Sequence, residues 1–274
     1  MDEARATAQP FLRWAGSKRK SLNILGHYWN SQFTNYIEPF VGSASLFFHL
    51  GPTQAILSDV NTELIEAFRA VQQCPDAVFE SLRPRPVHPN YYYSLRKQDP
   101  GRLPMPTRAA RFIYLNRFCF NGLYRTNLKG KFNVPFSGDK TGRKPKRKQF
   151  LQCARALSGV SLHVGDFETV VREHAAEGDF VYLDPPYATR ARRIFQEYDP
   201  ATFTIEDLAR LAKLLNDLAA KGVTFVLSYA YCPEILKMLG GWKHKKLFVQ
   251  RNIAGFAGHR RVAAEMLVTN ACPL

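Results

Sequence analysis

The chain of 274 residues is poor in cysteine, histidine and acidic residues, and it has no long apolar run. The cysteines form no C-x-x-C pair and no ligand spacing with the seven histidines, which argues against a disulfide scaffold, a zinc ribbon or any other metal site. No apolar run approaches the ~18 residues of a membrane span, and the first residues lack a signal-peptide core. The sequence therefore predicts a cytoplasmic protein without metal or membrane partners. The cysteines are Cys74, Cys119, Cys153, Cys232 and Cys272.

Positive charge is abundant and concentrated. The 38 Lys and Arg outnumber the 23 Asp and Glu, giving a formal charge of +15 that favours a polyanionic partner, nucleic acid before anionic membrane. Between Pro104 and Lys148 stand twelve Lys and Arg and one acid, Asp139, so that segment carries +11. A solvated face is an alternative reading for Lys140–Lys148.

Aromatic and asparagine side chains alternate with these cations. Cations hold phosphates, aromatic rings stack on or wedge between bases, and Asn or Arg reads base edges, so this mixture predicts a nucleic-acid interface. The aromatic residues are Phe112, Tyr114, Phe118, Phe120, Tyr124, Phe132 and Phe136, and the asparagines are Asn116, Asn121, Asn127 and Asn133.

Strand patterns alternate with helix patterns on either side of this segment. Such alternation predicts an α/β fold with a mostly parallel sheet, whose ligands bind at the carboxyl ends of the strands. A stretch from about Cys74 to Phe150 interrupts it and reads as an inserted domain. The expected strands are 36–37, 54–57, 161–164, 180–183 and 223–227. We expect one helix capped by Thr62, with Leu64, Ile65, Phe68 and Val71 on one face. We expect another capped by Thr204 and Asp207, with Ile205, Leu208, Leu211, Leu215 and Leu218 on one face.

A glycine turn follows the first strand, and an acid ends the second. Gly42 allows close backbone approach to a ligand, and Asp59 is placed to accept hydrogen bonds from two ribose hydroxyls. With a single glycine, a structural turn and a helix-capping Asp explain the same residues equally well. The segment from Trp14 to Lys18 resembles a phosphate loop but has Phe11 where the required glycine would stand, which excludes that class of NTPase.

Asp184-Pro185-Pro186-Tyr187 is the most specific motif. The prolines remove two N–H donors, leaving the Asp184 carboxylate and the Pro185 carbonyl as a rigid acceptor pair for an exocyclic amine. Bonding both amine protons would localise its lone pair towards an electrophile while Tyr187 stacks on the base. The base must first leave the duplex, at a cost of a few kcal/mol. A proline turn closing a strand is the structural alternative. No Pro-Cys pair is present, which argues against methylation of cytosine carbon 5.

Several segments together resemble the Dam-like DNA adenine-N6 methyltransferases over nearly the whole chain. The matching strings are FLRWAGSK (11–18), EPFVGSASLFF (38–48), SDVN (58–61), NRFCFNGLYRTNLKGKFNVPFS (116–137), GDF (165–167) and YLDPPYA (182–188). The resemblance implies a Rossmann-like methyltransferase sheet with helices on both faces, formed by residues 1–72 and 151–274. It also implies a mainly helical target-recognition domain inserted at 73–150.

The resemblance further implies roles for individual residues. S-adenosyl-L-methionine would be held by Trp14, Lys18, Phe40, Asp59, Asp166, Phe167 and Asp184. The catalytic residues would be Asp184, Pro185 and Tyr187. Double-stranded DNA would be bound by Arg13, Phe120, Asn121, Leu123, Arg125 and Pro135. Arg125 and Leu123 match positions that read bases in family members recognising GATC.

Some points stay open at the level of sequence. Phe120 stands where Tyr is commoner, and Ser228-Tyr229-Ala230 replaces a more usual Ser-Asn-His. An RNA base methyltransferase and a DNA-binding module without turnover are the competing hypotheses. Methylation of one strand at a time suits a monomer. The motifs leave open whether the enzyme serves a restriction-modification system or acts alone.

Overall fold

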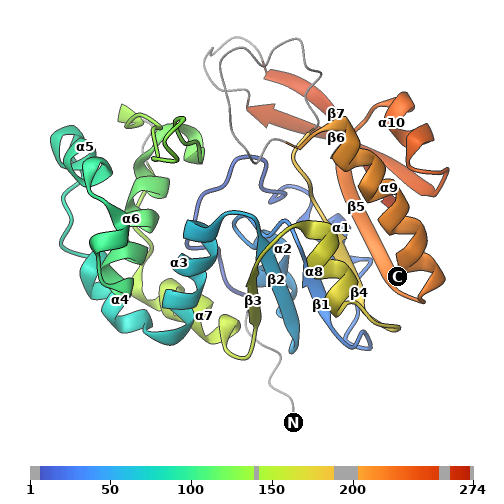
Figure 1. Ribbon diagram of the computed structural model, residues 1–274, viewed down its shortest axis with the longest axis horizontal. Helices are drawn as coiled ribbons and strands as arrows, with labels where there is room; N and C mark the ends of the chain where they lie inside the picture. The colour runs from blue at the N-terminus through green and yellow to red at the C-terminus, as the bar shows by residue number, and fades with distance from the viewer. Residues whose placement is uncertain (1–6, 139–141, 188–202, 253–259, 272–274) are drawn as a thin grey trace. The chain divides into compact units, whose positions relative to one another are not determined.

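The structure is a computed structural model that describes residues 7–138, 142–187, 203–252 and 260–271. Asp139, Lys140 and Cys272 lie outside the described residues, as does Ala188 of the YLDPPYA string. The described chain has a mixed α/β architecture with a seven-stranded sheet flanked by helices, consistent with the Rossmann-like methyltransferase fold expected from the sequence (Figure 1).

The sheet has the strand order β3-β2-β1-β4-β5-β7-β6. Neighbours from β2 to β5 run parallel, whereas β7 is antiparallel to both β5 and β6. The five strands expected from the sequence are present, and the β6–β7 hairpin adds an antiparallel edge. The strands are β1 Tyr36–Glu38, β2 Ala55–Asp59, β3 Ser161–Val164, β4 Phe180–Leu183, β5 Thr224–Ala230, β6 Lys243–Asn252 and β7 Arg260–Thr269.

The order of the strands reverses between β1 and β4. Chain connections leave β1 towards β2 on one side and return to β4 on the other, and ligands of such sheets bind at the carboxyl ends of strands at this reversal. β4 is apolar throughout and fully buried, as expected for a parallel strand covered on both faces. The fold therefore directs attention to the residues that end β1 and follow β4.

Helices connect and cover these strands. They are α1 Leu22–Gly26, α2 Ser45–Leu50, α3 Thr62–Gln73, α4 Pro75–Leu82, α5 Pro89–Lys97, α6 Met105–Phe118, α7 Arg147–Leu157, α8 Phe167–His174, α9 Ile205–Ala220 and α10 Pro233–Met238. Two single 3-10 turns are η1 Pro100–Arg102 and η2 Phe120–Gly122.

The chain divides into two compact units. The first unit comprises Met1–Lys18, Gly42–Thr53 and Asn61–Val164, and the second comprises Arg19–Val41, Gln54–Val60 and Gly165–Leu274. In the second unit, α8 and α9 pack against each other, and their apolar residues join those of β4 and β5 in one core.

Two helix details differ from the sequence expectation. Asn61, not Thr62, caps α3, because its side-chain oxygen accepts a hydrogen bond from the Leu64 amide at 3.1 Å. Thr204 and Asp207 do form the expected capping box of α9, but Ile205 in its first turn is 42% exposed. The apolar stripe of α9 instead continues through Leu214, which is buried.

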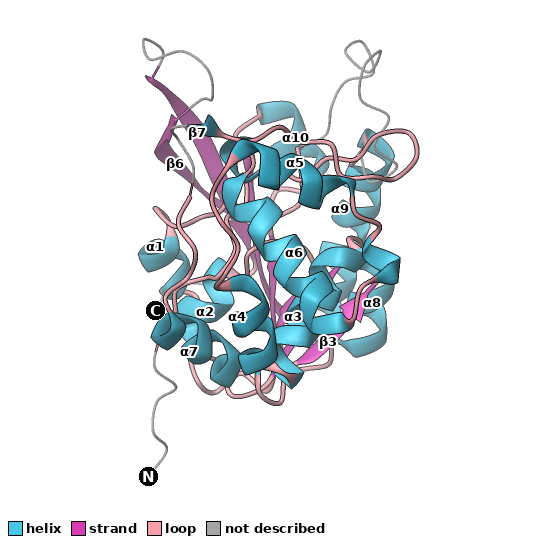
Figure 2. Cartoon of the chain, turned by 90° about the vertical axis from the view of Figure 1, so that its left-hand side faces the viewer, coloured by secondary structure: helices cyan, strands magenta, loops and turns pink. Residues whose placement is uncertain are grey.

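Helices of the first unit lie side by side, with α6 in contact with α3, α4 and α5, and α7 in contact with α3 and α4 (Figure 2). Burial in this unit corrects one expectation. Four of the aromatic rings expected at a nucleic-acid interface are core residues, between 0% and 8% exposed: Phe112, Tyr114, Phe118 and Phe132. Phe112, Tyr114 and Phe118 lie on α6, which neighbouring helices cover, and Phe132 is buried within the loop that follows α6, so these rings are not free to stack on bases.

Arg111 is likewise structural. It is 3% exposed and donates hydrogen bonds to the backbone oxygens of Leu95 and Arg96, at 3.1 and 3.0 Å. Burial lowers the pKa of its guanidinium, but the two carbonyls replace the lost water contacts. Part of the positive charge counted in the sequence therefore ties α6 to α5.

The loop after α6 is packed closely against the first unit's N-terminal segment. Gly122 has a φ of +66°, and a Cβ added there would lie 2.8 Å from Arg13 Cβ; at Gly130, φ is +69° and no atom lies within 4 Å.

We expect Gly130→Ala to lower the free energy of unfolding by about 1 kcal/mol, because alanine is strained in a left-handed backbone conformation. Gly122→Ala is expected to cost more, because the Arg13 backbone must also move. Urea unfolding of both variants measures the difference, and equal losses would contradict the close contact.

Candidate functional site

Carboxylates gather where the strand order of the second unit reverses. Glu38 ends β1 and is 3% exposed, and its Oε2 accepts a hydrogen bond from the Tyr36 hydroxyl at 2.8 Å. Asp184 follows the last residue of the central strand β4 and is half-buried. Glu265 on β7 is 3% exposed and lies opposite Ala230, the last residue of β5. Glu38 thus ends β1, Asp184 directly follows β4, and Glu265 lies within β7 beside the end of β5.

Tyr182 on β4 lies close enough to all three acids for their charges to act on its hydroxyl. Burial raises the pKa of its phenol well above the ordinary value, and the negative charges of Asp184, Glu38 and Glu265 raise it further. One buried ring therefore feels all three carboxylates. Glu38, Asp184 and Glu265, here called the acid cluster, therefore concentrate negative charge around Tyr182, and such charge favours a positively charged group beside it.

Tyr187 is held beside the cluster. Its ring packs edge-on against Tyr229 of β5, with 5.2 Å between the ring centroids and 81° between the planes. Its hydroxyl donates to Glu265 Oε1 at 3.4 Å. Pro185, between Asp184 and Tyr187, is buried. The structure thus brings the three expected catalytic residues together at the end of β4, and a strand far along the chain holds the tyrosine.

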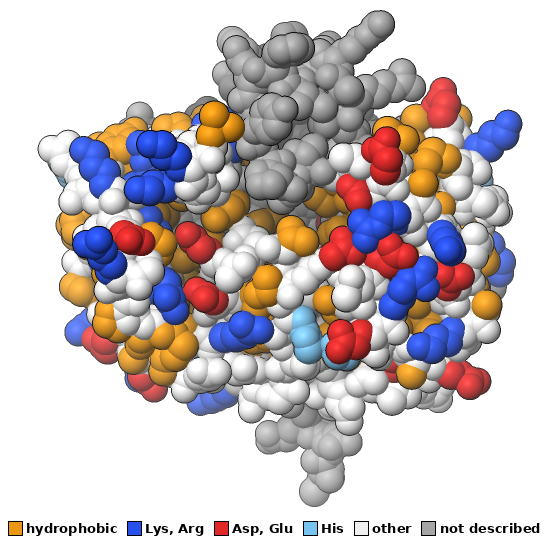
Figure 3. Space-filling model, viewed as in Figure 1, with side chains coloured by type: hydrophobic (Ala, Val, Ile, Leu, Met, Phe, Trp, Pro, Cys, Tyr) orange, Lys and Arg blue, Asp and Glu red, His pale blue; other side chains and the backbone are white. Residues whose placement is uncertain are grey.

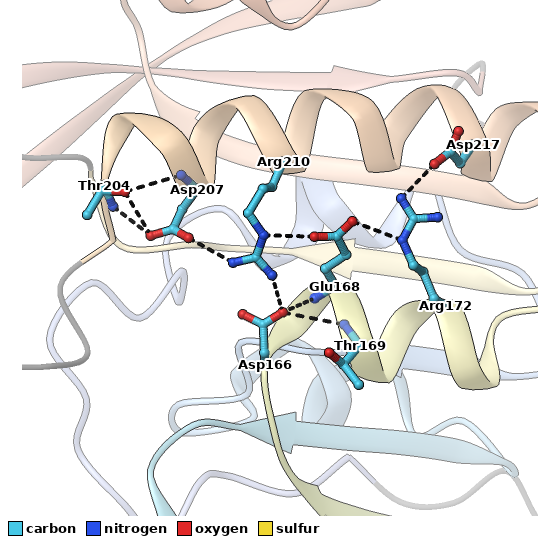
Figure 4. Close-up of polar contacts among 8 residues, drawn as sticks. All are labelled: Asp166, Glu168, Thr169, Arg172, Thr204, Asp207, Arg210 and Asp217. Atoms are coloured by element: carbon cyan, nitrogen blue, oxygen red, sulfur yellow. Dashed lines mark hydrogen bonds and ion pairs between the residues drawn. The ribbon is translucent and has the colours of Figure 1, made fainter.

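Five of the seven expected cofactor residues lie in the second unit: Phe40, Asp59, Asp166, Phe167 and Asp184. The rings of Phe40 and Phe167 stack with centroids 5.2 Å apart and planes at 28°. The amide of Gly165 donates to the Asp59 carbonyl at 3.2 Å, which brings the end of β2 next to the turn that starts α8. Asp166 caps α8 through bonds from the amides of Glu168 and Thr169, at 3.1 and 3.4 Å (Figure 4).

Trp14 and Lys18 belong to the first unit. The Trp14 indole stacks on the Tyr124 ring, with centroids 6.2 Å apart and planes at 17°. A Cβ added at Gly42 would lie 2.7 Å from Trp14 Cδ1, so any larger residue at position 42 would clash with the indole. Lys18 is 8% exposed.

Five of the six residues expected to bind DNA, all except Arg13, lie in one loop of the first unit between α6 and α7. The Phe120 amide donates to the Pro135 carbonyl at 2.9 Å, and the Asn133 amide donates to the Arg125 carbonyl at 3.0 Å. Phe120 and Leu123 are 36% and 37% exposed, high values for apolar side chains, and Pro135 is exposed. The loop of residues 120–135 therefore presents apolar groups outward.

Two further residues of this loop have a defined conformation: Arg125, expected to read a base, and Asn121, expected beside the flipped base. Arg125 Nε donates to Asn133 Oδ1 at 2.8 Å, which orients the guanidinium. Asn121 adopts a left-handed conformation with φ of 54°, uncommon for a residue other than glycine and a strain often found at functional positions.

Arg13 is tied to the last turn of α6, which leads into the same loop. Its backbone exchanges two hydrogen bonds with the Asn116 side chain, at 2.8 and 2.6 Å, and its guanidinium donates to the Arg117 carbonyl at 3.2 Å. Asn116, expected as a possible base reader, is thereby buried as a structural link.

A family model for D12 class N6 adenine-specific DNA methyltransferases matches residues 14–253. The chain belongs to this family. The type II methyltransferase M1.LlaDCHI of Lactococcus lactis subsp. cremoris is 33% identical to it, covering 98% of each chain. The DNA adenine methylase of Escherichia coli K12 is 31% identical, covering 94% of this chain and 93% of its own length. The type II methyltransferase M.MjaIII of Methanocaldococcus jannaschii is 31% identical, covering 89% and 92%.

As a D12 class methyltransferase, the chain is an enzyme that transfers a methyl group to adenine in DNA. The RNA methyltransferase and the inactive binding module are therefore not the favoured readings. Within the described residues, no helix is long and apolar enough to cross a membrane. Across the same residues, no group of three or more His, Cys, Asp or Glu is arranged to hold a metal ion.

Two members of the acid cluster of this D12 class enzyme were missed by sequence reasoning. Glu38 carries a local signal, because an acid at the end of a buried strand directly before Pro39 is unusual. Glu265 carries none: it lies on β7, 81 residues after Asp184, and only the pairing of β5 with β7 brings it to the site.

Proposed function

We propose that this enzyme transfers the methyl group of S-adenosyl-L-methionine to the N6 amine of a flipped adenine in double-stranded DNA, with GATC as the favoured target. The acid cluster, which lies at the end of β1, after β4 and on β7 beside the end of β5, is the observation that carries the proposal. S-adenosyl-L-methionine brings a sulfonium and an ammonium, so it offers the positive charge that these carboxylates suit.

The remaining cofactor residues suit the adenosine part of the same molecule. Phe40, which is partly buried and stacks on the buried Phe167 ring, offers apolar surface for a purine, and Phe167 supports it from beneath. Asp59 ends β2, where a carboxylate can accept both ribose hydroxyls. Asp166 offers an acceptor for the exocyclic amine of that purine. Trp14 and Lys18 complete the proposed set. When bound, the cofactor supplies an electrophilic methyl group on sulfur.

At the target base, the chain's own groups prepare the amine. The Asp184 carboxylate and the Pro185 carbonyl accept hydrogen bonds from the two N6 protons, which turns the nitrogen lone pair away from the purine ring. Tyr187 stacks on the flipped base and is held in place by Tyr229 and Glu265. The nitrogen gains the methyl group, the rest of the donor leaves as S-adenosylhomocysteine, and one N6 proton passes to solvent, so the charge on the amine is unchanged at the end of the reaction.

DNA recognition belongs to residues 73–150 in this proposal, acting as a target-recognition domain. Arg125 and Leu123 read base edges, Phe120 and Asn121 enter the stack beside the flipped base, and Pro135 and Arg13 contact the duplex. The exposed apolar side chains in the loop of residues 120–135, together with the left-handed backbone of Asn121, support these roles.

We further propose a monomer in the cytoplasm, because one strand is methylated at a time and the described cysteines are free thiols suited to a reducing compartment. The relatives include both type II methyltransferases and DNA adenine methylases, so either setting, restriction-modification or solitary methylation, fits the enzyme.

Methyl transfer from labelled S-adenosyl-L-methionine tests donor and target together. Two duplexes of equal composition are compared, one with a single GATC and one with that site permuted, and the digested DNA is analysed by mass spectrometry. We expect labelled N6-methyladenine from the GATC duplex alone. Equal labelling of both duplexes would refute GATC, and unlabelled product would refute the donor.

A further inference from the structure

Arg210, which no expectation from the sequence included, stands behind the proposed adenine site. It lies on α9, and its guanidinium pairs with three acids: Nη2 with Asp166 Oδ1 at 2.5 Å, Nε with Glu168 Oε2 at 2.8 Å and Nη1 with Asp207 Oδ1 at 2.9 Å (Figure 4). The Arg210 guanidinium also lies 4.9 Å from the centroid of the Phe167 ring. One side chain thus contacts both residues proposed to hold the cofactor's adenine.

Three hydrogen bonds to one oxygen of Asp166 hold its carboxylate in a single orientation. Oδ1 accepts from Arg210 and from the amides of Glu168 and Thr169, at 2.5, 3.1 and 3.4 Å. None of the described residues is bonded to Oδ2, so that oxygen stays available to a ligand. An unsupported carboxylate rotates about its side-chain bond, whereas three donors on one oxygen fix where the other points.

The planar fork of arginine suits this task. It presents donors in fixed directions to several carboxylates at once, which the point charge of lysine cannot do. Hydrogen bonds to Asp166, and then to Glu168 and Asp207, raise the pKa of Arg210, so it stays charged throughout the working range. Burial opposes ionisation of Glu168, but bonds from Arg210 and Arg172 outweigh it and lower the pKa of that carboxyl. The group remains a fixed ion pair at neutral pH.

Arg210 is not simply one of many surface ion pairs. Acidic and basic side chains are interspersed over α8 and α9 (Figure 3), and Arg172 provides the comparison. Arg172 pairs with Glu168 at 2.9 Å and with Asp217 at 2.7 Å, and within the part of the chain that the structure describes it bonds to neither Asp166 nor Phe167 (Figure 4). Both arginines join α8 to α9, but only Arg210 reaches the proposed site.

We infer that Arg210 is a positioning residue of the cofactor site, which fixes Asp166 Oδ2 towards the exocyclic amine of the cofactor's adenine and supports the Phe167 ring. This rests on the proposed function, which gives Asp166 and Phe167 to the adenine. Asp207 forms an ion pair with Arg210 and also completes the capping box with Thr204. The first turn of α9 therefore helps to position Arg210 and, through it, to set the affinity for the cofactor.

Calorimetry on the full chain without DNA tests the inference. Binding of S-adenosylhomocysteine and of its analogue lacking the 6-amino group is measured for the wild type and for the variants Arg210→Ala, Arg210→Lys and Arg172→Ala. Losing a charged positioning contact is expected to weaken S-adenosylhomocysteine binding about tenfold in Arg210→Ala. The wild-type preference for the amino-bearing ligand should shrink by a similar factor. Arg210→Lys should fall between, and Arg172→Ala should match the wild type in both measurements.

Thermal melting of each variant separates this role from general destabilisation. The two alanine variants each lose surface ion pairs between α8 and α9, so a purely structural role would move their melting points without changing the preference for the amino group. Unchanged binding by Arg210→Ala, or an equal loss in Arg172→Ala, would overturn the positioning role alone. A wild type that binds neither ligand would overturn the proposed cofactor, and this inference with it.

Discussion

Asp184→Ala is expected to abolish most methyl transfer while leaving duplex binding close to that of the wild type. In the proposed mechanism the carboxylate accepts a hydrogen bond from one N6 proton, and removing a comparable polar contact from an active site costs about 10²–10³ in kcat. Duplex affinity depends chiefly on phosphate contacts, which this substitution does not touch. Single-turnover methylation with saturating DNA measures the chemical step, and a fluorescence anisotropy titration measures the affinity.

Two further variants sharpen that comparison. Asp184→Asn keeps the size and one acceptor oxygen but loses the charge, so its rate should lie between those of the wild type and the alanine variant. Asp217→Ala removes an acid from α9 whose partner is Arg172, and it should leave the rate unchanged. If duplex binding by Asp184→Ala fell as far as its rate, Asp184 would be a structural residue.

Arg125→Ala is expected to change which sequences are methylated more than it weakens binding overall. A bidentate contact between arginine and guanine is worth about 1–3 kcal/mol of discrimination against the wrong base. The bond from Arg125 Nε to Asn133 holds the guanidinium in one orientation, as such reading requires. Competitive methylation of a pool of duplexes, each with one base changed, measures the preference at every position.

Lys129→Ala is the matched comparison, since Lys129 is an exposed cation four residues further along the same loop. Its loss should weaken binding to all sequences alike and reduce the dependence of affinity on salt. A uniform loss in Arg125→Ala would make Arg125 a phosphate contact like its neighbour.

The aromatic residues of the basic segment mark one limit of sequence reasoning. Phe118 and Phe120 stand two positions apart among the same cations, yet Phe118 is 1% exposed and Phe120 is 36% exposed. A phenylalanine is as well suited to a helix interface as to a base, and the choice depends on which side of α6 its neighbours cover. No local pattern carries that information.

The sequence by itself determined the central strands, the turn that follows each and the family, because these depend on short segments whose neighbours along the chain set their shape. Asp184 follows an unbroken apolar strand, and its role needs only the prolines beside it. The tertiary structure decided the rest: β7 brings Glu265 to Tyr187, and α9 brings Arg210 to Asp166, 44 residues earlier. Burial and ion pairing between residues so far apart along the chain depend on how the elements pack. The partners of a carboxylate or a guanidinium are therefore known only from the tertiary structure.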